Sequence, residues 1–215
     1  MIIAFPITGG KKMTLLTRSI FFISLLALPS CTALSTLNQA ATPLATFELQ
    51  PITNASAASR SRITLLIVEP TAPAAIATDR ILVKQNQQSV SYLPDARWAD
   101  EAQLMIQSVI IQSLSAGGRF GFVGAQDVGP VPDMVLLTRI DRFGVDIGAG
   151  DTVTVRLSFD LTVLRDRDQR VLGTRSFSGD AAIRSDQVDP VVTGFQMVMD
   201  DLLGEIVSWT MATAR

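Results

Sequence analysis

The side chains that could carry out acid–base chemistry are carboxylates near the end of the chain. Asp200, Asp201 and Glu205 are close in sequence and could be arranged as a general acid and a general base. Their positions fall on the polar face of a predicted helix, which is typical of a solvated surface. Lys84 could activate a serine, but no serine near it stands in a nucleophile-elbow context. We therefore expect no catalytic role for these residues.

Two further motifs match binding loops only in part. The glycines of segment 118–124 (GRFGFVG) suggest a phosphate loop, but such a loop leads from a strand into a helix, and this segment leads from a predicted helix into a strand. The run 166–168 (DRD) resembles the start of a calcium loop, yet Val171 and Phe177 stand where that loop needs Gly and Glu. We interpret this run as the tip of a hairpin.

The composition excludes several classes of site. The chain has no His and one Cys, which excludes imidazole bases, Ser-His-Asp and Cys-His nucleophiles, thiolate metal clusters and internal disulfides. Residues 1–30 hold three of the 18 Lys and Arg and none of the 20 Asp and Glu, so the remainder has a net charge of −5. This balance argues against nucleic-acid binding. We expect no enzyme activity, no metal and no cofactor.

The single cysteine, Cys31, follows a secretory signal. Three cations precede an uncharged apolar run, residues 19–28, which is about half of the roughly 20 residues that span a bilayer as a helix. Segment 28–31 (LPSC) resembles the lipobox of bacterial lipoproteins, with Pro29 as a departure from the usual pattern. We predict that residues 1–30 are a lipoprotein signal peptide and that Cys31 carries covalent diacylglycerol and an acyl chain such as palmitate.

An ordinary signal peptide with a coincidental cysteine is the alternative, but a sole Cys at this position favours lipidation. Thr32, rather than Asp, follows the cysteine. Under the sorting rule of enteric bacterial lipoproteins, this similarity implies the inner leaflet of the outer membrane, with the protein facing the periplasm. Met13 is a second candidate start beside Met1, since residues 1–12 add nothing that a signal needs.

Composition divides the rest of the chain into two parts. Residues 31–62 are rich in Ala, Ser, Thr, Pro, Asn and Gln, which predicts a lipidated N-terminus and a flexible tether with a short strand near 46–50. Residues 63–213 are long enough to bury a self-sufficient core, and we expect them to form a single domain.

Apolar periodicity predicts the strands of this domain. Strict alternation over residues 153–163 is the clearest signal, and segment 134–147 shows a phase slip between Ile140 and Phe143 that predicts a β-bulge. The expected strands are residues 63–68, 81–83, 90–93, 134–147, 153–163 and 171–177.

Two helical stripes complete the pattern. One covers residues 98–114 with Asp95 as its N-cap, and the other covers 191–207 after an Asp189-Pro190 start. The order of elements indicates an α+β fold: a mostly antiparallel sheet of about five to seven strands with two amphipathic helices packed on one side. Trp98 and Trp209 would then be packing residues at helix ends, with partner contact as the second interpretation.

Three segments, taken in order, resemble the ABC-type transport auxiliary lipoprotein family, which serves MCE-type lipid transport systems such as the paraquat-inducible one. They are 46–49 (TFEL), 78–83 (TDRILV) followed by 97–100 (RWAD), and 177–179 (FSG) leading into the last helix. The similarity extends over residues 44–210. It implies the following candidate partner-contact residues: Asp79, Arg80, Arg97, Trp98 and Trp209.

The family resemblance implies a non-enzymatic periplasmic subunit that docks an MCE-domain protein, with its ABC permease and ATPase, at the outer membrane. Lipids would then move between the inner and outer membranes, and the subunit would form a homo-oligomer. A different class remains open, namely a structural or assembly lipoprotein of an outer-membrane complex without a role in lipid flux. A periplasmic hydrolase is a third interpretation.

Overall fold

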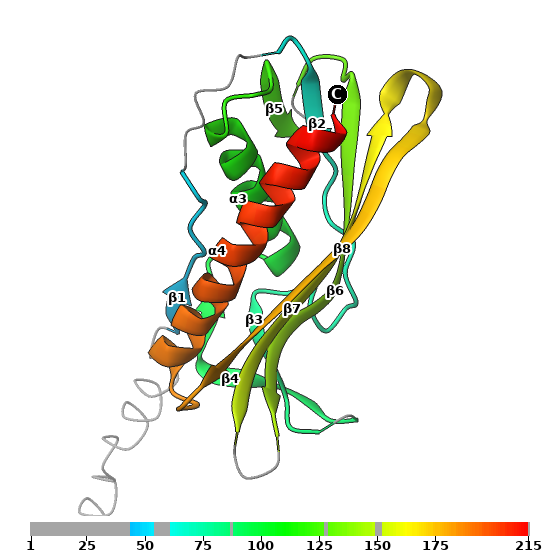
Figure 1. The fold of residues 1–215 in the computed structure, drawn as a ribbon. Helices are drawn as coiled ribbons and strands as arrows, with labels where there is room; N and C mark the ends of the chain where they lie inside the picture. The colour runs from blue at the N-terminus through cyan, green and yellow to red at the C-terminus, as the bar shows by residue number, and fades with distance from the viewer. Residues whose placement is uncertain (1–43, 54–60, 87, 127–128, 149–151, 215) are drawn as a thin grey trace, which may run out of the picture. The chain divides into compact units, whose positions relative to one another are not determined.

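A computed structural model describes residues 44–53, 61–86, 88–126, 129–148 and 152–214. Their helices α3 (Ala102–Ala116) and α4 (Val188–Thr213) lie on the same side of an eight-stranded sheet (Figure 1). The predicted signal peptide and Cys31 lie outside the described residues. Within the described part of the chain, neither helix is long and apolar enough to span a membrane.

The α+β class and the two helices are confirmed, but the sheet is mixed, so the expectation of a mostly antiparallel sheet is wrong. The antiparallel pairs are β3 with β4, β6 with β7, and β7 with β8, while the parallel pairs are β1 with β4, β3 with β6, and β2 with both β5 and β6. Parallel neighbours need a long crossover, and the connection through α3 supplies one between β2 and β6. The strands are β1 (Ala45–Phe47), β2 (Thr64–Ile67), β3 (Arg80–Lys84), β4 (Val90–Trp98), β5 (Phe122–Ala125), β6 (Met134–Ile147), β7 (Val153–Arg165) and β8 (Arg170–Ile183).

Strand β6 pairs with three other strands of the sheet, β2, β3 and β7. One of its edges pairs with β7 along the whole strand, and the other edge is shared by β2 near Met134 and β3 near Val145. The register against β7 shifts between Ile140 and Arg142, which confirms the predicted bulge. Ile140 and Phe143 are both buried on the helix side because the bulge inserts one residue between them.

The first helix starts later than expected. Trp98 is the last residue of β4, its backbone N–H donates to the carbonyl of Asp79 at 2.7 Å, and α3 begins at Ala102. The expected N-cap, Asp95, lies inside β4 with a φ of 57°. The prediction of a helix from residue 98 is therefore wrong, because backbone pairing holds Trp98 in the sheet although its side chain has the spacing of the helical stripe.

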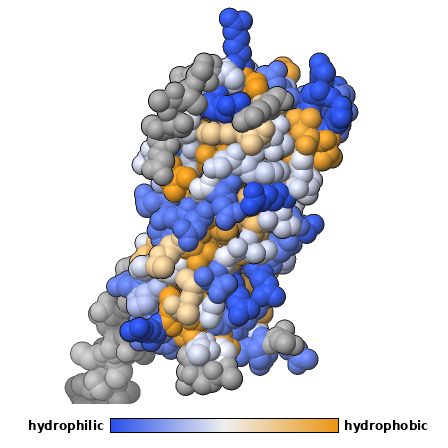
Figure 2. Space-filling model, in the orientation of Figure 1, coloured by the Kyte–Doolittle hydropathy of each residue, from blue (hydrophilic) through white to orange (hydrophobic). Residues whose placement is uncertain are grey.

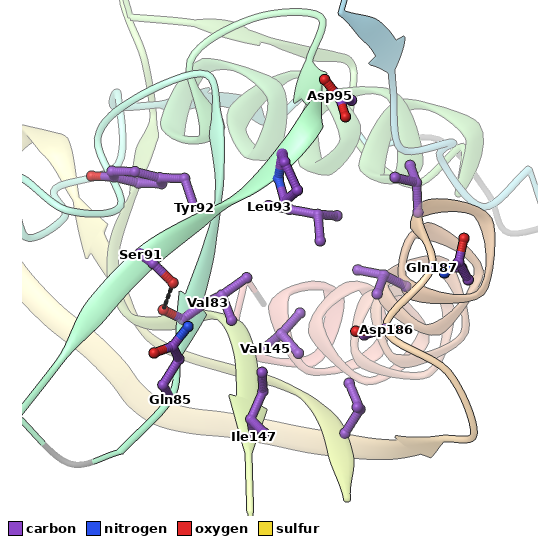
Figure 3. A pocket seen from close by; sticks show the side chains of 14 residues that line it. Val83, Gln85, Ser91, Tyr92, Leu93, Asp95, Val145, Ile147, Asp186 and Gln187 are labelled. Carbon is purple, nitrogen blue, oxygen red and sulfur yellow. Dashed lines mark hydrogen bonds between the residues drawn. The ribbon is translucent and has the colours of Figure 1, made fainter. Parts of the chain in front are cut away.

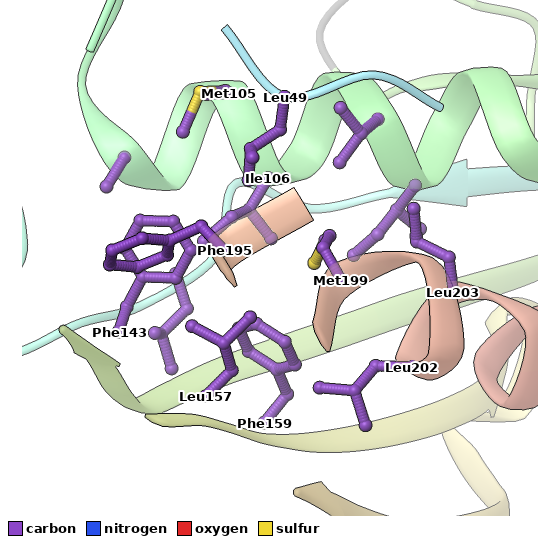
Figure 4. Close-up of a cluster of buried hydrophobic side chains, with 14 of the residues drawn as sticks. Leu49, Met105, Ile106, Phe143, Leu157, Phe159, Phe195, Met199, Leu202 and Leu203 are labelled. Atoms are coloured by element: carbon purple, nitrogen blue, oxygen red, sulfur yellow. The ribbon is translucent and has the colours of Figure 1, made fainter. Parts of the chain in front are cut away.

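The core fills the space between the sheet and the helices (Figure 4). Phe143 from β6, Phe159 from β7 and Phe195 from α4 are almost fully buried there, together with Met105 and Ile106 from α3. The ring centroids of Phe143 and Phe195 are 5.0 Å apart. Viewed from the α4 side, the surface shows apolar residues in separate patches among polar ones (Figure 2).

Part of the segment expected to be a tether joins this core. Strand β1 pairs in parallel with residues 96–98 of β4, and Leu49 is buried in the core. Residues 31–43 and 54–60 lie outside the described residues. The sheet thus starts upstream of residue 63.

Candidate functional site

The carboxylates considered for acid–base chemistry lie on the exposed side of α4. Gln196 Nε2 donates to Asp200 Oδ1 at 2.6 Å, and Arg175 forms an ion pair with Glu205 at 2.8 Å, while Asp201 is exposed. Each group therefore has the surroundings of a solvated helix face. Among the described residues, no three His, Cys, Asp or Glu side chains are grouped as metal ligands.

Residues 166–168 form a turn between β7 and β8, which confirms the predicted hairpin tip. The guanidinium of Arg165 donates two hydrogen bonds to the carboxylate of Asp168, both at 2.9 Å. These bonds lower the pKa of Asp168 because they favour its charged form. The carboxylate is thus engaged by Arg165 at this tip.

Four of the five residues implied by the family resemblance come together where β3 begins and β4 ends. Arg97 Nη1 lies 3.6 Å from Asp79 Oδ2, and the guanidinium of Arg80 lies 5.6 Å from the ring centroid of Tyr92. The Trp98 side chain is 1% exposed. Asp79 and Arg97 are therefore accessible to a partner, whereas Trp98 serves the core.

Two aromatic rings pack against Trp98 in that core. Its ring centroid lies 5.5 Å from Phe143 and 5.0 Å from Phe195. Its buried indole N–H has no hydrogen-bond partner among the described residues. Burial of an unpaired N–H costs about 1–3 kcal/mol, and the contact with Phe195 anchors the β4 end to α4.

Trp209 lies near the other end of α4. It packs edge-on against Phe177 with a centroid distance of 5.6 Å, and Gly173 of β8 lies under its ring edge. The structure does not bring it together with the Asp79–Trp98 group. Its half-buried side chain fastens the last turns of α4 to β8.

An apolar pocket of about 370 Å³ lies beside β4 and is here called the β4 pocket (Figure 3). It lies between the β3–β4 hairpin, the end of β6, the start of β7 and the residues that lead into α4. Its floor is apolar and consists of Val83, Leu93, Val145, Ile147, Val153 and Val191. Such a floor suits the burial of apolar side chains.

The rim of the β4 pocket is acidic. Exposed Asp95 comes from β4, and exposed Asp186 precedes α4, whereas none of the lining residues is Lys or Arg. Uncharged polar groups complete the rim, among them Gln85 and Ser91, whose hydroxyl donates to the Val83 carbonyl at 3.4 Å (Figure 3). The pocket therefore favours an apolar group accompanied by a positive charge.

Sequence reasoning missed this pocket because its walls come from segments more than 100 residues apart, from Val83 to Val191. No linear motif describes them. One local signal was present, namely the Pro94-Asp95 pair within an otherwise apolar strand pattern. It was compatible with a helix N-cap, which concealed its place on a strand.

Solved structures share this fold. A Xanthomonas campestris protein of family DUF330 matches with 21% identity and a TM-score of 0.70, covering 79% of this chain and 96% of that one. An uncharacterized protein matches with 13% identity and a TM-score of 0.61 over 77% and 97%. A hypothetical Chlamydia trachomatis protein matches with 11% identity and a TM-score of 0.50 over 71% and 98%. These identities support the fold alone.

Curated proteins provide no match to this chain. A family model, in contrast, covers most of the folded part. The model of the ABC-type transport auxiliary lipoprotein component matches residues 46–207, from the second residue of β1 to the last turns of α4. This range contains four of the five residues that the sequence resemblance singled out, and Trp209 lies two residues beyond its end. The chain therefore belongs to the ABC-type transport auxiliary lipoprotein component family.

Proposed function

We propose that this protein is a non-enzymatic, lipid-anchored periplasmic subunit that docks an MCE-type ABC transport assembly at the outer membrane and supports lipid movement between the two membranes. The family match over residues 46–207 carries the proposal, because that family supplies an auxiliary lipoprotein component of ABC-type transport. The exposed carboxylates of α4, each in solvated surroundings, agree with a non-enzymatic role.

The anchor in this proposal is the lipid on Cys31. Ala45, the first residue of β1, is the fourteenth residue after Cys31, and a fully extended chain of that length spans at most about 50 Å. The domain would then reach its partner from the membrane without leaving the periplasmic face of the outer membrane.

The docking surface in this proposal is the β4 pocket. Its occupant would be a segment of the MCE-domain protein that presents apolar side chains next to a Lys or Arg. The apolar floor supports the first feature, and the carboxylates of Asp95 and Asp186 support the second. Acting as a homo-oligomer, the subunit would present several such pockets; analytical ultracentrifugation that finds only monomers would contradict the oligomer.

Affinity purification of the full-length anchored protein, followed by mass spectrometry, tests the docking proposal. We expect recovery of the MCE-domain protein together with the permease and ATPase. Reversal of the pocket charge by Asp186→Lys should lower this recovery about tenfold or more. Asp201→Lys makes the same charge change on the exposed side of α4 and should leave recovery unchanged. Recovery of outer-membrane proteins without transporter subunits would favour a structural or assembly lipoprotein instead.

The anchor has its own test. Cys31→Ala should abolish palmitate labelling, and the chain should leave the membrane fraction or stay unprocessed, because the sole thiol is removed. Labelling and fractionation of cells that express the two forms measure this. Labelling that persists in the variant would show that Cys31 is not the attachment site.

A further inference from the structure

A cluster of cations lies on the side of the sheet that faces away from the helices. Lys84 of β3, Arg142 of β6 and Arg156 of β7 line one hollow of about 450 Å³ together with Asp146. Lys84 stands opposite Asp146 in the register of β3 and β6. Three positive side chains from three strands thus surround one carboxylate.

The ion pairs in this hollow are looser than the one at the hairpin tip. Arg142 Nη1 and Arg156 Nε lie 3.8 and 3.5 Å from the same oxygen, Oδ2 of Asp146. At the hairpin tip, in contrast, Arg165 makes two parallel bonds of 2.9 Å to Asp168. A single shared oxygen leaves most guanidinium N–H donors of Arg142 and Arg156 available to a ligand.

Gly144 lies among these residues on the sheet. It lies opposite Arg156 in the register of β6 and β7, between Arg142 and Asp146 on its own strand. A Cβ atom at Gly144 would lie 3.0 Å from the carbonyl oxygen of Leu82. The close approach of β3 therefore disfavours a side chain here, and Gly144 lines a smaller hollow that shares Lys84, Arg142, Asp146 and Arg156 with the larger one.

The local charge differs from that of the whole chain. Residues 31–215 have a net charge of −5, yet their single Lys and two of their Arg, Arg142 and Arg156, converge on this hollow. Asp180 stands opposite Arg156 in the register of β7 and β8, but among the described residues the ion pairs of Arg156 include only Asp146. The cations thus exceed the carboxylates that engage them.

We propose that this hollow binds the phosphate group of an anionic ligand, with Arg142 and Arg156 as forked donors and Lys84 as a third positive contact. Planar guanidinium groups match phosphate oxygens in pairs, and the ammonium group of Lys84 adds a third positive charge beside them. Free phosphate and the headgroup of an anionic lipid share this chemistry. The proposal is independent of the transport role proposed above.

Titration calorimetry on the full-length protein in a neutral maltoside detergent tests this site with two probes, inorganic phosphate and dihexanoyl-phosphatidylglycerol. Arg142→Gln/Arg156→Gln should weaken binding at least about tenfold, because each charge-assisted contact that is lost lowers affinity by roughly that factor. Arg167→Gln/Arg170→Gln removes the same charge near the hairpin tip and should leave the affinity unchanged. Thermal unfolding of both variants checks that they are folded.

The two probes separate the possible sources of the phosphate group. Binding of both probes, weakened in the Arg142/Arg156 variant alone, shows that the phosphate group suffices. Binding of the lipid alone, with the same loss, assigns the site to a lipid headgroup. If neither probe binds, or if both double variants bind equally well, the proposal is overturned.

Discussion

The two sides of the sheet differ in chemistry where β3, β6 and β7 meet. On the helix side, Val145 and Val155 are buried, and Val145 also lines the β4 pocket. One residue later on the same strands, Asp146 and Arg156 face the hollow that Lys84 and Arg142 also line, here called the basic hollow. The period of two along a strand therefore places an apolar surface and a charged surface back to back. One sheet can thus offer two chemically different surfaces at the same end.

The largest expected effect on stability comes from removing a buried side chain on the helix side of the sheet. Phe159→Ala removes a fully buried ring and should lower the free energy of unfolding by about 3–5 kcal/mol. Ser158→Ala, one residue earlier and on the opposite side, should change it by no more than about 0.5 kcal/mol. Urea unfolding of the two variants measures both values. Similar losses in the two would show that the sides do not differ as described.

A second pair of variants sharpens the comparison at the close approach of β3 and β6. Gly144→Ala should destabilise the fold by about 1–3 kcal/mol, because the new Cβ lies 3.0 Å from a backbone oxygen. Gly204→Ala on α4 meets nothing within 4 Å and should instead stabilise by up to about 1 kcal/mol. Thermal unfolding distinguishes the two signs. A neutral Gly144→Ala would mean that the strands can separate at little cost.

The smallest expected effect concerns the forked ion pair at the hairpin tip. Because Arg165 lowers the pKa of Asp168 in the folded protein, this group stabilises the fold above its ordinary pKa of 3.8, and its contribution is lost as the pH falls through the lowered value. NMR titration should give Asp168 a midpoint below 3.8, and Arg165→Gln should return it towards that value. An unchanged midpoint in the variant would contradict the assignment.

Local patterns were sufficient to predict much of the fold. Strict alternation predicted β7, the polar segment after Lys84 predicted the β3–β4 hairpin, and the phase slip predicted the bulge in β6. Each of these features is set by neighbouring residues, through the alternation of side chains or the chemistry of a turn. Such features are visible in a single sequence.

Pairing between distant strands was not predictable in the same way. The continuous apolar run of β2 is typical of a parallel strand buried on both faces, but nothing in it identifies β5 and β6 as neighbours. The helical spacing of Trp98 likewise matched the next helix, while a backbone bond to Asp79 holds it in β4. Tertiary hydrogen bonds decided both cases.

The candidate site illustrates the same limit. Asp79, Arg97 and Trp98 were singled out by resemblance to a family, and they do meet at one end of β4. The β4 pocket and the basic hollow depend instead on which strands become neighbours. Their residues are ordinary in sequence, and only the register brings Lys84 next to Asp146.

The bulge in β6 has a genetic consequence. Before it, residues with even numbers such as Ile140 face the helices, and after it, odd-numbered ones such as Phe143 and Val145 do so. The register with β7 skips Asp141, so loss of its codon would leave the pairs on both sides of it unchanged and give β6 unbroken alternation. Loss of a codon within a regular part of β6 would instead turn the side chains beyond it to the opposite face, so Asp141 is the position in this strand where a deletion disturbs the two faces least.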